Sequence, residues 1–270
     1  MTAVSATHAG DAVRPRKGGF LHDLVSVASR ALRLIPRDLE TTIPALIVPV
    51  FFFVVNIGSL QNLAEAGIPD LDFKAFQLPV AIIFAVTGIS RASTLVTDIQ
   101  DGYFDRMLMT PMNRHALLLG LMVADFTLVV ALCIPVLIMG ALVGVSFASG
   151  PLGILVFLLL AGAWGLVFTG FPYAIALKTG NPGAVNSSFI LFFPFAFLTT
   201  SFLPEEALTG WMATIAQYNP VTYLLGALRS LLIVGWDAEA LWQGIVAVAL
   251  VGLLSQTLAF KALSGRVRRG

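Results

Sequence analysis

The sequence predicts an all-α membrane protein with six membrane-spanning helices, from its composition, its uncharged runs and the distribution of its charges. Of its 270 residues, 57% are hydrophobic and only 11% are charged, whereas a soluble domain carries about 25% charged residues. We therefore expect lipid to form part of the solvent around this chain.

Charge-free runs locate the expected spans, because a helix needs about 20 mostly apolar residues to cross the hydrocarbon core and charges there are costly. One uncharged run, residues 126–177, is long enough for two spans and is divided by the turn-rich residues 144–151. Within a membrane domain of residues 20–270, the expected spans cover about residues 41–60, 78–97, 116–143, 152–176, 184–203 and 239–261.

Another uncharged run, residues 207–228, does not suit a lipid-facing helix. It contains Gln217, Asn219 and Pro220, and Pro220 would break a continuous helix. Non-helical backbone at membrane depth survives only where protein or water covers it. We expect this run to form two short re-entrant helices at the outer face, between the fifth and sixth spans.

The distribution of Lys and Arg predicts that both termini are cytoplasmic. Cytoplasmic flanks are enriched in these residues, and two basic ends on one side require an even number of spans. The basic residues of the two ends are Arg14, Arg16, Lys17, Arg30, Arg33, Arg37, Lys261, Arg266, Arg268 and Arg269. The expected outer loops are acidic, with Glu65, Asp70, Asp72, Glu205, Glu206, Asp237 and Glu239.

The N-terminal region is expected to stay outside the bilayer core. Residues 1–19 are small and polar, and no apolar signal-peptide segment follows them, which predicts a disordered cytoplasmic tail. Residues 21–35 have helical periodicity, with apolar residues on one face and arginines on the other. This pattern is typical of an interfacial helix in the cytoplasmic headgroup layer, and a soluble amphipathic helix is the alternative.

The longest charged segment between two expected spans, residues 97–114, favours a docking surface. Tyr103, Phe104, Met107 and Leu108 lie among its charges and, if exposed, have the composition of a protein interface. A loop that only connects two helices could be shorter and more polar. Plain connection is the alternative interpretation.

The sequence contains no pattern typical of catalysis or of nucleic-acid binding. A phosphate-binding loop ends in Gly-Lys-Ser/Thr, and Lys178-Thr179 has no glycine before it. The three histidines are scattered and form no His-Glu-x-x-His motif. The net charge of +1 provides no basic field for a nucleic acid. We expect a subunit that is not an enzyme and binds no metal or cofactor itself.

Two segments carry a resemblance to a known family. Residues 101–114 follow an acidic-Gly, acidic-Arg, apolar pair, Thr-Pro, Arg pattern, and residues 203–229 contain an Asn-Pro-aliphatic-Thr-Tyr and an Ala-Leu-Arg pattern. In these places the chain resembles the ABC-2 type permeases, and among them the daunorubicin-resistance-type exporters. The resemblance implies that Asp101, Gly102, Tyr103, Phe104, Asp105, Arg106, Met107, Leu108, Thr110, Pro111 and Arg114 couple to an ATPase. It also implies an outer gate with Asn219, Pro220, Thr222, Tyr223 and Arg229.

The resemblance further implies a function and partners. The chain would be a permease subunit in the bacterial inner membrane, with residues 101–114 as a coupling helix in a groove of the ATPase. Its partners would be two copies of an ABC ATPase subunit that bind ATP and Mg²⁺, a second permease subunit, identical or homologous, and the lipid bilayer. The expected cargo is a drug-like or lipid-like amphiphile. The alternatives are a polysaccharide or glycolipid cargo and, in another class, a non-ABC polytopic scaffold or channel.

Two ionisable residues, Arg91 and Asp125, are expected inside the bilayer. At about 1.5 Å per residue, Arg91 lies about 20 Å from the outer end of its span, and Asp125 lies about 14 Å from the inner end of its own. In a hydrocarbon core about 30 Å thick, these two depths differ by only a few ångströms. We expect an ion pair between the second and third spans, and a role along the substrate path is the alternative. Cys133, the one cysteine, lies in an apolar run and predicts neither a disulfide nor a metal site.

Overall fold

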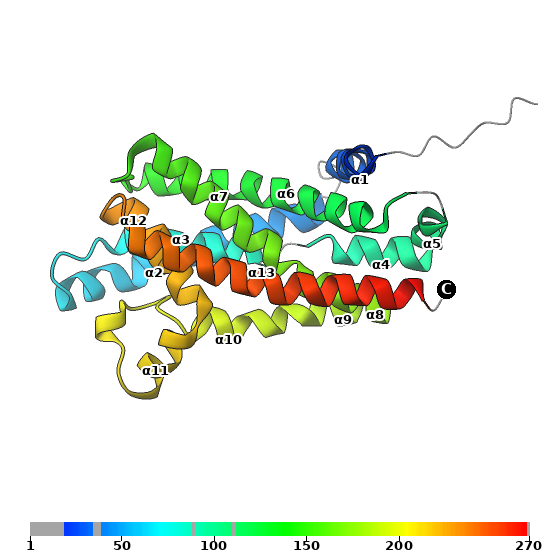
Figure 1. The fold of residues 1–270 in the computed structure, drawn as a ribbon. Helices are drawn as coiled ribbons and strands as arrows, with labels where there is room; N and C mark the ends of the chain where they lie inside the picture. Colours follow the sequence, from blue (N-terminus) through cyan, green and yellow to red (C-terminus); the bar gives the residue numbers. More distant parts are fainter. Residues whose placement is uncertain (1–18, 35–38, 88–89, 110–111, 269–270) are drawn as a thin grey trace, which may run out of the picture.

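The computed structural model describes residues 19–34, 39–87, 90–109 and 112–268, and this part of the chain contains helices and no strand. Most helices run along the long axis of one elongated bundle (Figure 1). The elements are α1 (Phe20–Leu34), α2 (Leu39–Gly67), α3 (Phe73–Thr87), α4 (Ala92–Gln100), α5 (Tyr103–Leu108), α6 (Arg114–Leu142), α7 (Gly150–Phe168), α8 (Gly170–Thr179), α9 (Pro182–Ser187), η2 (Ser188–Leu191), α10 (Phe192–Phe197), η3 (Glu205–Ala207), α11 (Gly210–Tyr218), α12 (Pro220–Ile233) and α13 (Ala238–Val267). The predicted all-α class is confirmed. Of the predicted tail, residues 1–18 lie outside the described residues.

Four helical stretches of the described chain are long and apolar enough to cross a bilayer. They are Phe73–Gln100, Arg114–Leu142, Gly150–Thr179 and Ala238–Val267. These stretches overlap the spans expected at residues 78–97, 116–143, 152–176 and 239–261.

The other two expected spans stay predictions. Residues 41–60 lie within α2. Residues 184–203 are divided among α9, η2, α10 and the segment after them, and the apolar stretch Pro182–Phe197 is shorter than the about 20 residues that a crossing needs. A fifth span in this region would therefore need residues beyond this helical stretch.

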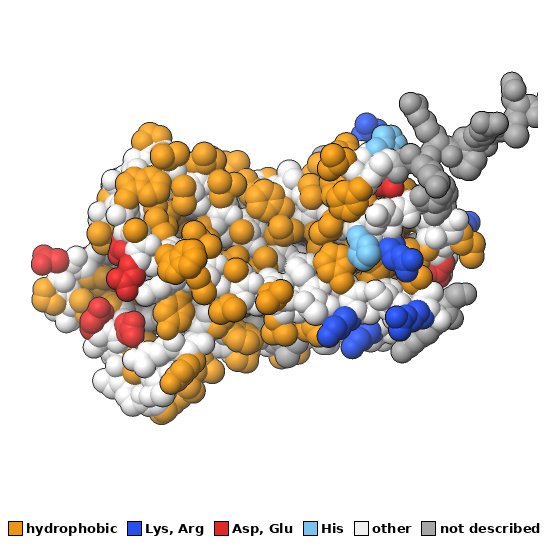
Figure 2. Space-filling model, viewed as in Figure 1, with side chains coloured by type: hydrophobic (Ala, Val, Ile, Leu, Met, Phe, Trp, Pro, Cys, Tyr) orange, Lys and Arg blue, Asp and Glu red, His pale blue; other side chains and the backbone are white. Residues whose placement is uncertain are grey.

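Many of the exposed charged side chains lie near the two ends of the bundle. On the face that Figure 2 shows, acidic side chains gather at the end that carries the α2–α3 connection, and basic side chains gather at the opposite end. α1, α5 and the last turns of α13 lie together at this basic end (Figure 1). The apolar surface between the two ends is the band that a bilayer would cover.

α1 lies across the bundle against α6, and a glycine permits the close approach (Figure 1). Val27 is buried at this contact, and a Cβ added to Gly120 of α6 would lie 2.7 Å from the Cβ of Val27. Leu21 and Val25, which the sequence places on the same apolar face, are exposed. The apolar surface of α1 is thus wider than its contact with α6, and its outer stripe suits an interfacial position.

The buried side chains form two main clusters along the bundle. One joins α3, α6, α7 and α12, and the other joins α4, α5, α6, α8 and α13. α8 and α13 cross closely because Gly170 carries no side chain: a Cβ there would lie 2.6 Å from the main-chain carbonyl carbon of Ser255. The second cluster packs α5 onto the membrane-spanning helices.

Candidate functional site

α5 begins at a sharp turn after α4, at the basic end of the bundle. Gly102, at this turn, has a φ of 68°, a left-handed conformation that residues with a side chain rarely adopt. A Cβ on Gly102 would meet no atom within 4 Å. The glycine of the predicted docking loop is therefore explained by backbone conformation rather than by close packing.

Two arginines from opposite ends of the chain hold α5 in place. Arg30 of α1 lies 4.2 Å from the ring centroid of Tyr103 and forms an ion pair of 3.4 Å with Asp98 of α4. Arg266 of α13 forms an ion pair of 3.2 Å with Asp105 of α5. A displacement of α5 must therefore move α1 and α13 with it or break these contacts.

α5 turns one face into the bundle and the other outward. Phe104 is only 1% exposed and packs in the buried cluster of the basic end, so the expectation that it belongs to an exposed surface is wrong. Asp101, Arg106 and Met109 are exposed, Met109 to 85%. Together with Tyr103, which Arg30 partly covers, they form the outer edge of α5.

The carboxylate of Asp23 in α1 holds the end of the segment that links α5 to α6. Oδ2 of Asp23 accepts a hydrogen bond of 3.0 Å from the main-chain N–H of Asn113, and Oδ1 of Asn113 accepts one of 2.9 Å from the N–H of His115, which caps α6. Of the remaining predicted coupling residues, Met107 and Leu108 are half-buried, Arg114 is exposed, and Thr110 and Pro111 lie outside the described residues.

At the acidic end, the chain breaks into two helices, α11 and α12, at the position predicted from Pro220. Asn219 joins this break to the preceding segment: its Nδ2 donates to the carbonyl oxygens of Phe195 and Leu198, both at 2.7 Å. Its Oδ1 accepts from the N–H of Val221 at 3.0 Å and caps α12. Pro220 occupies the first turn of α12, where its missing N–H breaks no helical hydrogen bond.

Arg229 of α12 connects three segments of the acidic end. Its Nε donates to the carbonyl oxygen of Phe76 in α3 at 3.1 Å, and its guanidinium carbon lies 3.5 Å from the ring centroid of Phe76. Its Nη1 and Nη2 donate to Oγ1 and the carbonyl oxygen of Thr200, at 2.9 and 2.7 Å. None of the ion pairs between described residues includes Arg229, so neutral oxygens and a ring stabilise its charge.

The other two predicted gate residues also form hydrogen bonds at this end. The hydroxyl oxygens of Thr222 and Thr199 lie 2.6 Å apart, and the Tyr223 hydroxyl donates to the carbonyl oxygen of Gln217 at 2.6 Å. Four of the five predicted gate residues therefore connect α12 with its neighbours, and Pro220 sets the start of the helix.

Arg91 and Asp125 lie together, but through a different contact from the predicted ion pair. Asp125 of α6 is 0% exposed; its Oδ1 accepts from the main-chain N–H of Arg91 at 3.2 Å and its Oδ2 from the Tyr173 hydroxyl at 2.7 Å. The guanidinium of Arg91 donates instead to the carbonyl oxygen of Ala31 in α1. The physical reason is the start of α4, which leaves a main-chain N–H without a helical partner, and the carboxylate binds it.

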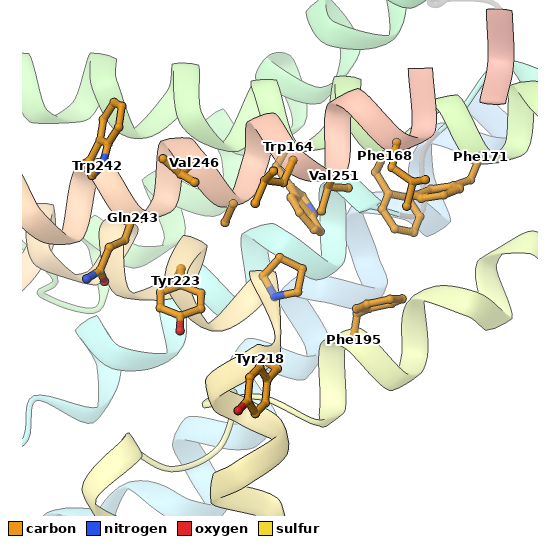
Figure 3. Close-up of a pocket in the computed structure, with 14 residues that line it drawn as sticks. Trp164, Phe168, Phe171, Phe195, Tyr218, Tyr223, Trp242, Gln243, Val246 and Val251 are labelled. Carbon is orange, nitrogen blue, oxygen red and sulfur yellow. The ribbon is translucent and has the colours of Figure 1, made fainter. Parts of the chain in front are cut away.

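A groove with many aromatic side chains opens between α7, α8, α10 and the last three helices. Its volume is about 490 Å³, within the range of drug-sized ligand sites. Figure 3 shows Phe195 and Tyr218 on the opposite side of the groove from Trp164 and Phe168. We call it the aromatic groove; its lining is Trp164, Phe168, Phe171, Phe195, Tyr218, Pro220, Tyr223, Trp242, Gln243, Val246, Ala247, Leu250, Val251 and Leu254.

The aromatic groove was not predicted from the sequence. No Lys, Arg, Asp or Glu lines it, and its polar side-chain groups are the two tyrosine hydroxyls, the two tryptophan indole N–H groups and the amide of Gln243. One signal was present: Trp164, Phe168 and Phe171 follow the i, i+4, i+7 spacing of one helix face. The facing residues come from segments distant in sequence, so the cavity itself depends on the tertiary packing.

Comparisons with known proteins agree on one family. The family model described as "ABC-2 type transporter" matches residues 22–233. The daunorubicin resistance ABC transporter permease protein DrrB1 of Streptomyces coeruleorubidus is 28% identical over 202 residues, which are 73% of this chain and 69% of the relative. The probable doxorubicin resistance ABC transporter permease protein DrrC of Mycobacterium tuberculosis is 24% identical over 211 residues, which are 78% of this chain and 76% of the relative.

Proposed function

Because this chain belongs to the ABC-2 type transporter family, we propose that it is the membrane-spanning permease subunit of an ATP-binding-cassette exporter, powered by a separate ATPase chain. In the proposed complex, two ATPase subunits bind ATP and Mg²⁺, and a second permease subunit, identical or homologous, completes the pathway. The chain spans the bacterial cell membrane six times with both termini in the cytoplasm. The basic side chains that gather at one end, on the face that Figure 2 shows, support this orientation.

The observation that carries this proposal is the position of α5, which Arg30 and Arg266 hold against α1 and α13. The helix lies at the basic end, with Asp101, Arg106 and Met109 exposed, while Arg30 and Arg266 connect it to α1 and α13. An ATPase that binds the outer edge of α5 can therefore transmit its movement to the first and last helices. In this mechanism, α11 and α12 close the outer end of the pathway.

Substitutions on the outer edge of α5 test the docking role. The double variant Arg106→Glu and Met109→Asp should lower the amount of ATPase that co-purifies with the chain by about 10-fold or more, because mismatched charges at an interface cost several kcal/mol. The measurement is the ratio of nucleotide-hydrolysing chain to permease after purification from membranes. Phe104 is left unchanged because it is buried and its substitution would disturb the fold.

A charge reversal at the other end provides the control. Glu206 in η3 is exposed at the acidic end. Glu206→Arg should leave the amount of co-purified ATPase unchanged. Undiminished co-purification with the double variant would exclude α5 as the docking site.

We further propose that the exporter moves a planar aromatic amphiphile and that the aromatic groove receives it. The groove offers rings for stacking and a few hydroxyl and amide groups, which suit a ring system with polar edges. The absence of charged residues among the lining residues does not favour an anionic polysaccharide. Doxorubicin is a suitable probe, since one relative carries this drug in its name.

Trp242 provides the sharpest test of the groove. It lines the groove and is 66% exposed, so Trp242→Ala removes a stacking surface without opening the core. In the purified complex, we expect the concentration of doxorubicin that half-maximally stimulates ATP hydrolysis to rise roughly 2- to 10-fold, the range that an aromatic contact contributes.

The matched control is Trp211→Ala in α11, because Trp211 is 67% exposed and is not among the lining residues. It should leave the half-maximal concentration unchanged. Stimulation by a polysaccharide and not by doxorubicin would assign the complex to glycan export instead.

A further inference from the structure

A second groove lies at the basic end, between α5, α8 and α13. Its volume is about 440 Å³. The lining consists of Asp105, Leu177, Lys178, Lys261, Ala262, Gly265 and Arg266. No part of the proposed coupling or cargo binding uses its two lysines.

The groove carries three cations and one carboxylate. Asp105 is already paired with Arg266 at 3.2 Å. Lys178 and Lys261 are exposed, and neither takes part in a hydrogen bond or ion pair between side chains that the structure describes. The two ammonium groups therefore provide positive charge that the described protein leaves without a counter-charge.

Each lysine lies where the uncharged run of a helix ends. In α13, the uncharged run between Glu239 and Lys261 matches the about 20 residues that cross a hydrocarbon core. In Gly150–Thr179, Lys178 is the one charged residue and belongs to the last turn. Since α8 and α13 pack against each other, the two lysines mark the same boundary, at the depth of lipid headgroups.

The inner side of the groove is apolar and leaves room for a ligand. Leu177 and Ala262 are buried there. A Cβ added to Gly265 would meet no atom within 4 Å, so the helix surface at this point is open. The groove thus combines an apolar side with a cationic rim.

We propose that this groove binds the phosphodiester headgroup of an anionic phospholipid, with Lys178 and Lys261 on the phosphate and Arg266 at its edge. Basic pockets between membrane helices recognise such headgroups, and the apolar side accommodates the start of the acyl chains. A soluble anion would use the cations but not the apolar side. This proposal does not rest on the ATPase partner or on the cargo, so it can fail or hold independently of the proposed function.

Titration of the purified full chain with lipids tests the proposal. Short-chain phosphatidylglycerol, phosphatidylcholine with the same acyl chains and inorganic phosphate are added in turn, and bound molecules are counted by native mass spectrometry. Phosphatidylglycerol should bind, phosphatidylcholine should bind much more weakly, and inorganic phosphate should not displace phosphatidylglycerol. Lys178→Ala with Lys261→Ala should weaken phosphatidylglycerol binding about 30-fold, the combined effect of two cations near an anionic headgroup.

Two further variants separate the site from general charge and from misfolding. Lys178→Arg with Lys261→Arg keeps both charges and should retain binding. Arg268→Ala removes an exposed cation at the end of the same helix that does not line the groove, and it should leave binding largely unchanged.

Several outcomes would overturn the proposal. Equal affinity in the double alanine variant and the unmodified chain would exclude the two lysines. Equal binding of phosphatidylcholine, or full displacement by inorganic phosphate, would show that no anionic lipid is selected. Loss of a co-purifying ATPase with unchanged lipid binding in the alanine variant would assign the surface to that partner.

Discussion

Replacing Arg229 with leucine should lower the free energy of unfolding by about 3 kcal/mol or more. Three oxygen acceptors, one on Phe76 and two on Thr200, lose their donor, and each buried polar group left unsatisfied costs about 1–3 kcal/mol. Leucine fills part of the volume but replaces none of these hydrogen bonds. The measurement is the midpoint temperature of thermal unfolding in a mild detergent. Unfolding is monitored as the loss of the monodisperse peak in size-exclusion chromatography.

Lys74→Leu is the matched control for this variant. Lys74 is a cation of the same end whose Nζ donates to a single acceptor, the carbonyl oxygen of Val143 at 3.3 Å. Its loss should cost about 0.5–1.5 kcal/mol, the net contribution of one hydrogen bond. If Arg229→Leu and Lys74→Leu lowered the midpoint equally, the three-way connection made by Arg229 would not contribute to stability.

The second large loss of stability is expected from Asp125→Leu, at the buried carboxylate of α6. The substitution leaves the Tyr173 hydroxyl and the main-chain N–H of Arg91 without an acceptor, at about 1–3 kcal/mol for each group. We expect a loss of about 2–6 kcal/mol, measured by thermal unfolding as for the Arg229 variant. Because the carboxylate is 0% exposed, water cannot take its place.

The conservative variant Asp125→Asn separates hydrogen bonding from charge. The amide oxygen can accept from the Arg91 N–H, and the amide nitrogen can donate to the Tyr173 oxygen once the hydroxyl turns. This variant should therefore keep most of the stability. Exchange of Arg91 and Asp125 should recover nothing, because the guanidinium binds Ala31 instead. If asparagine were as damaging as leucine, the negative charge itself would be essential, and the ion pair predicted from the sequence would be the better description.

The features that sequence reasoning located correctly have local causes. The break before Pro220 follows from the backbone preferences of proline. The four crossing helices follow from uncharged runs of sufficient length. In each case, the physical cause lies within the segment itself.

The features that sequence reasoning missed depend on partners far along the chain. α5 has only six residues, too few for a helical period to tell which side is buried, so Phe104 was expected outside. The sequence suggested Asp125 as the partner of the Arg91 guanidinium. The packing of α1 on α6 instead brings the carbonyl oxygen of Ala31 to it. In the sequence, Lys178 and Lys261 are two basic residues 83 positions apart, near the ends of two expected spans. The packing of α8 against α13 places both on one groove.

By itself, the amino-acid order determined an all-α membrane chain, the helix break at Asn219–Pro220 and the loop that carries α5. These follow from hydrophobicity and backbone chemistry, which act over one helix or one turn. Only the tertiary structure decided which face of α5 is free, what Arg229 and Asp125 bind, and where the two grooves open. Contacts between side chains from separate helices depend on how those helices cross, and the crossings are set by close approaches such as those at Gly120 and Gly170.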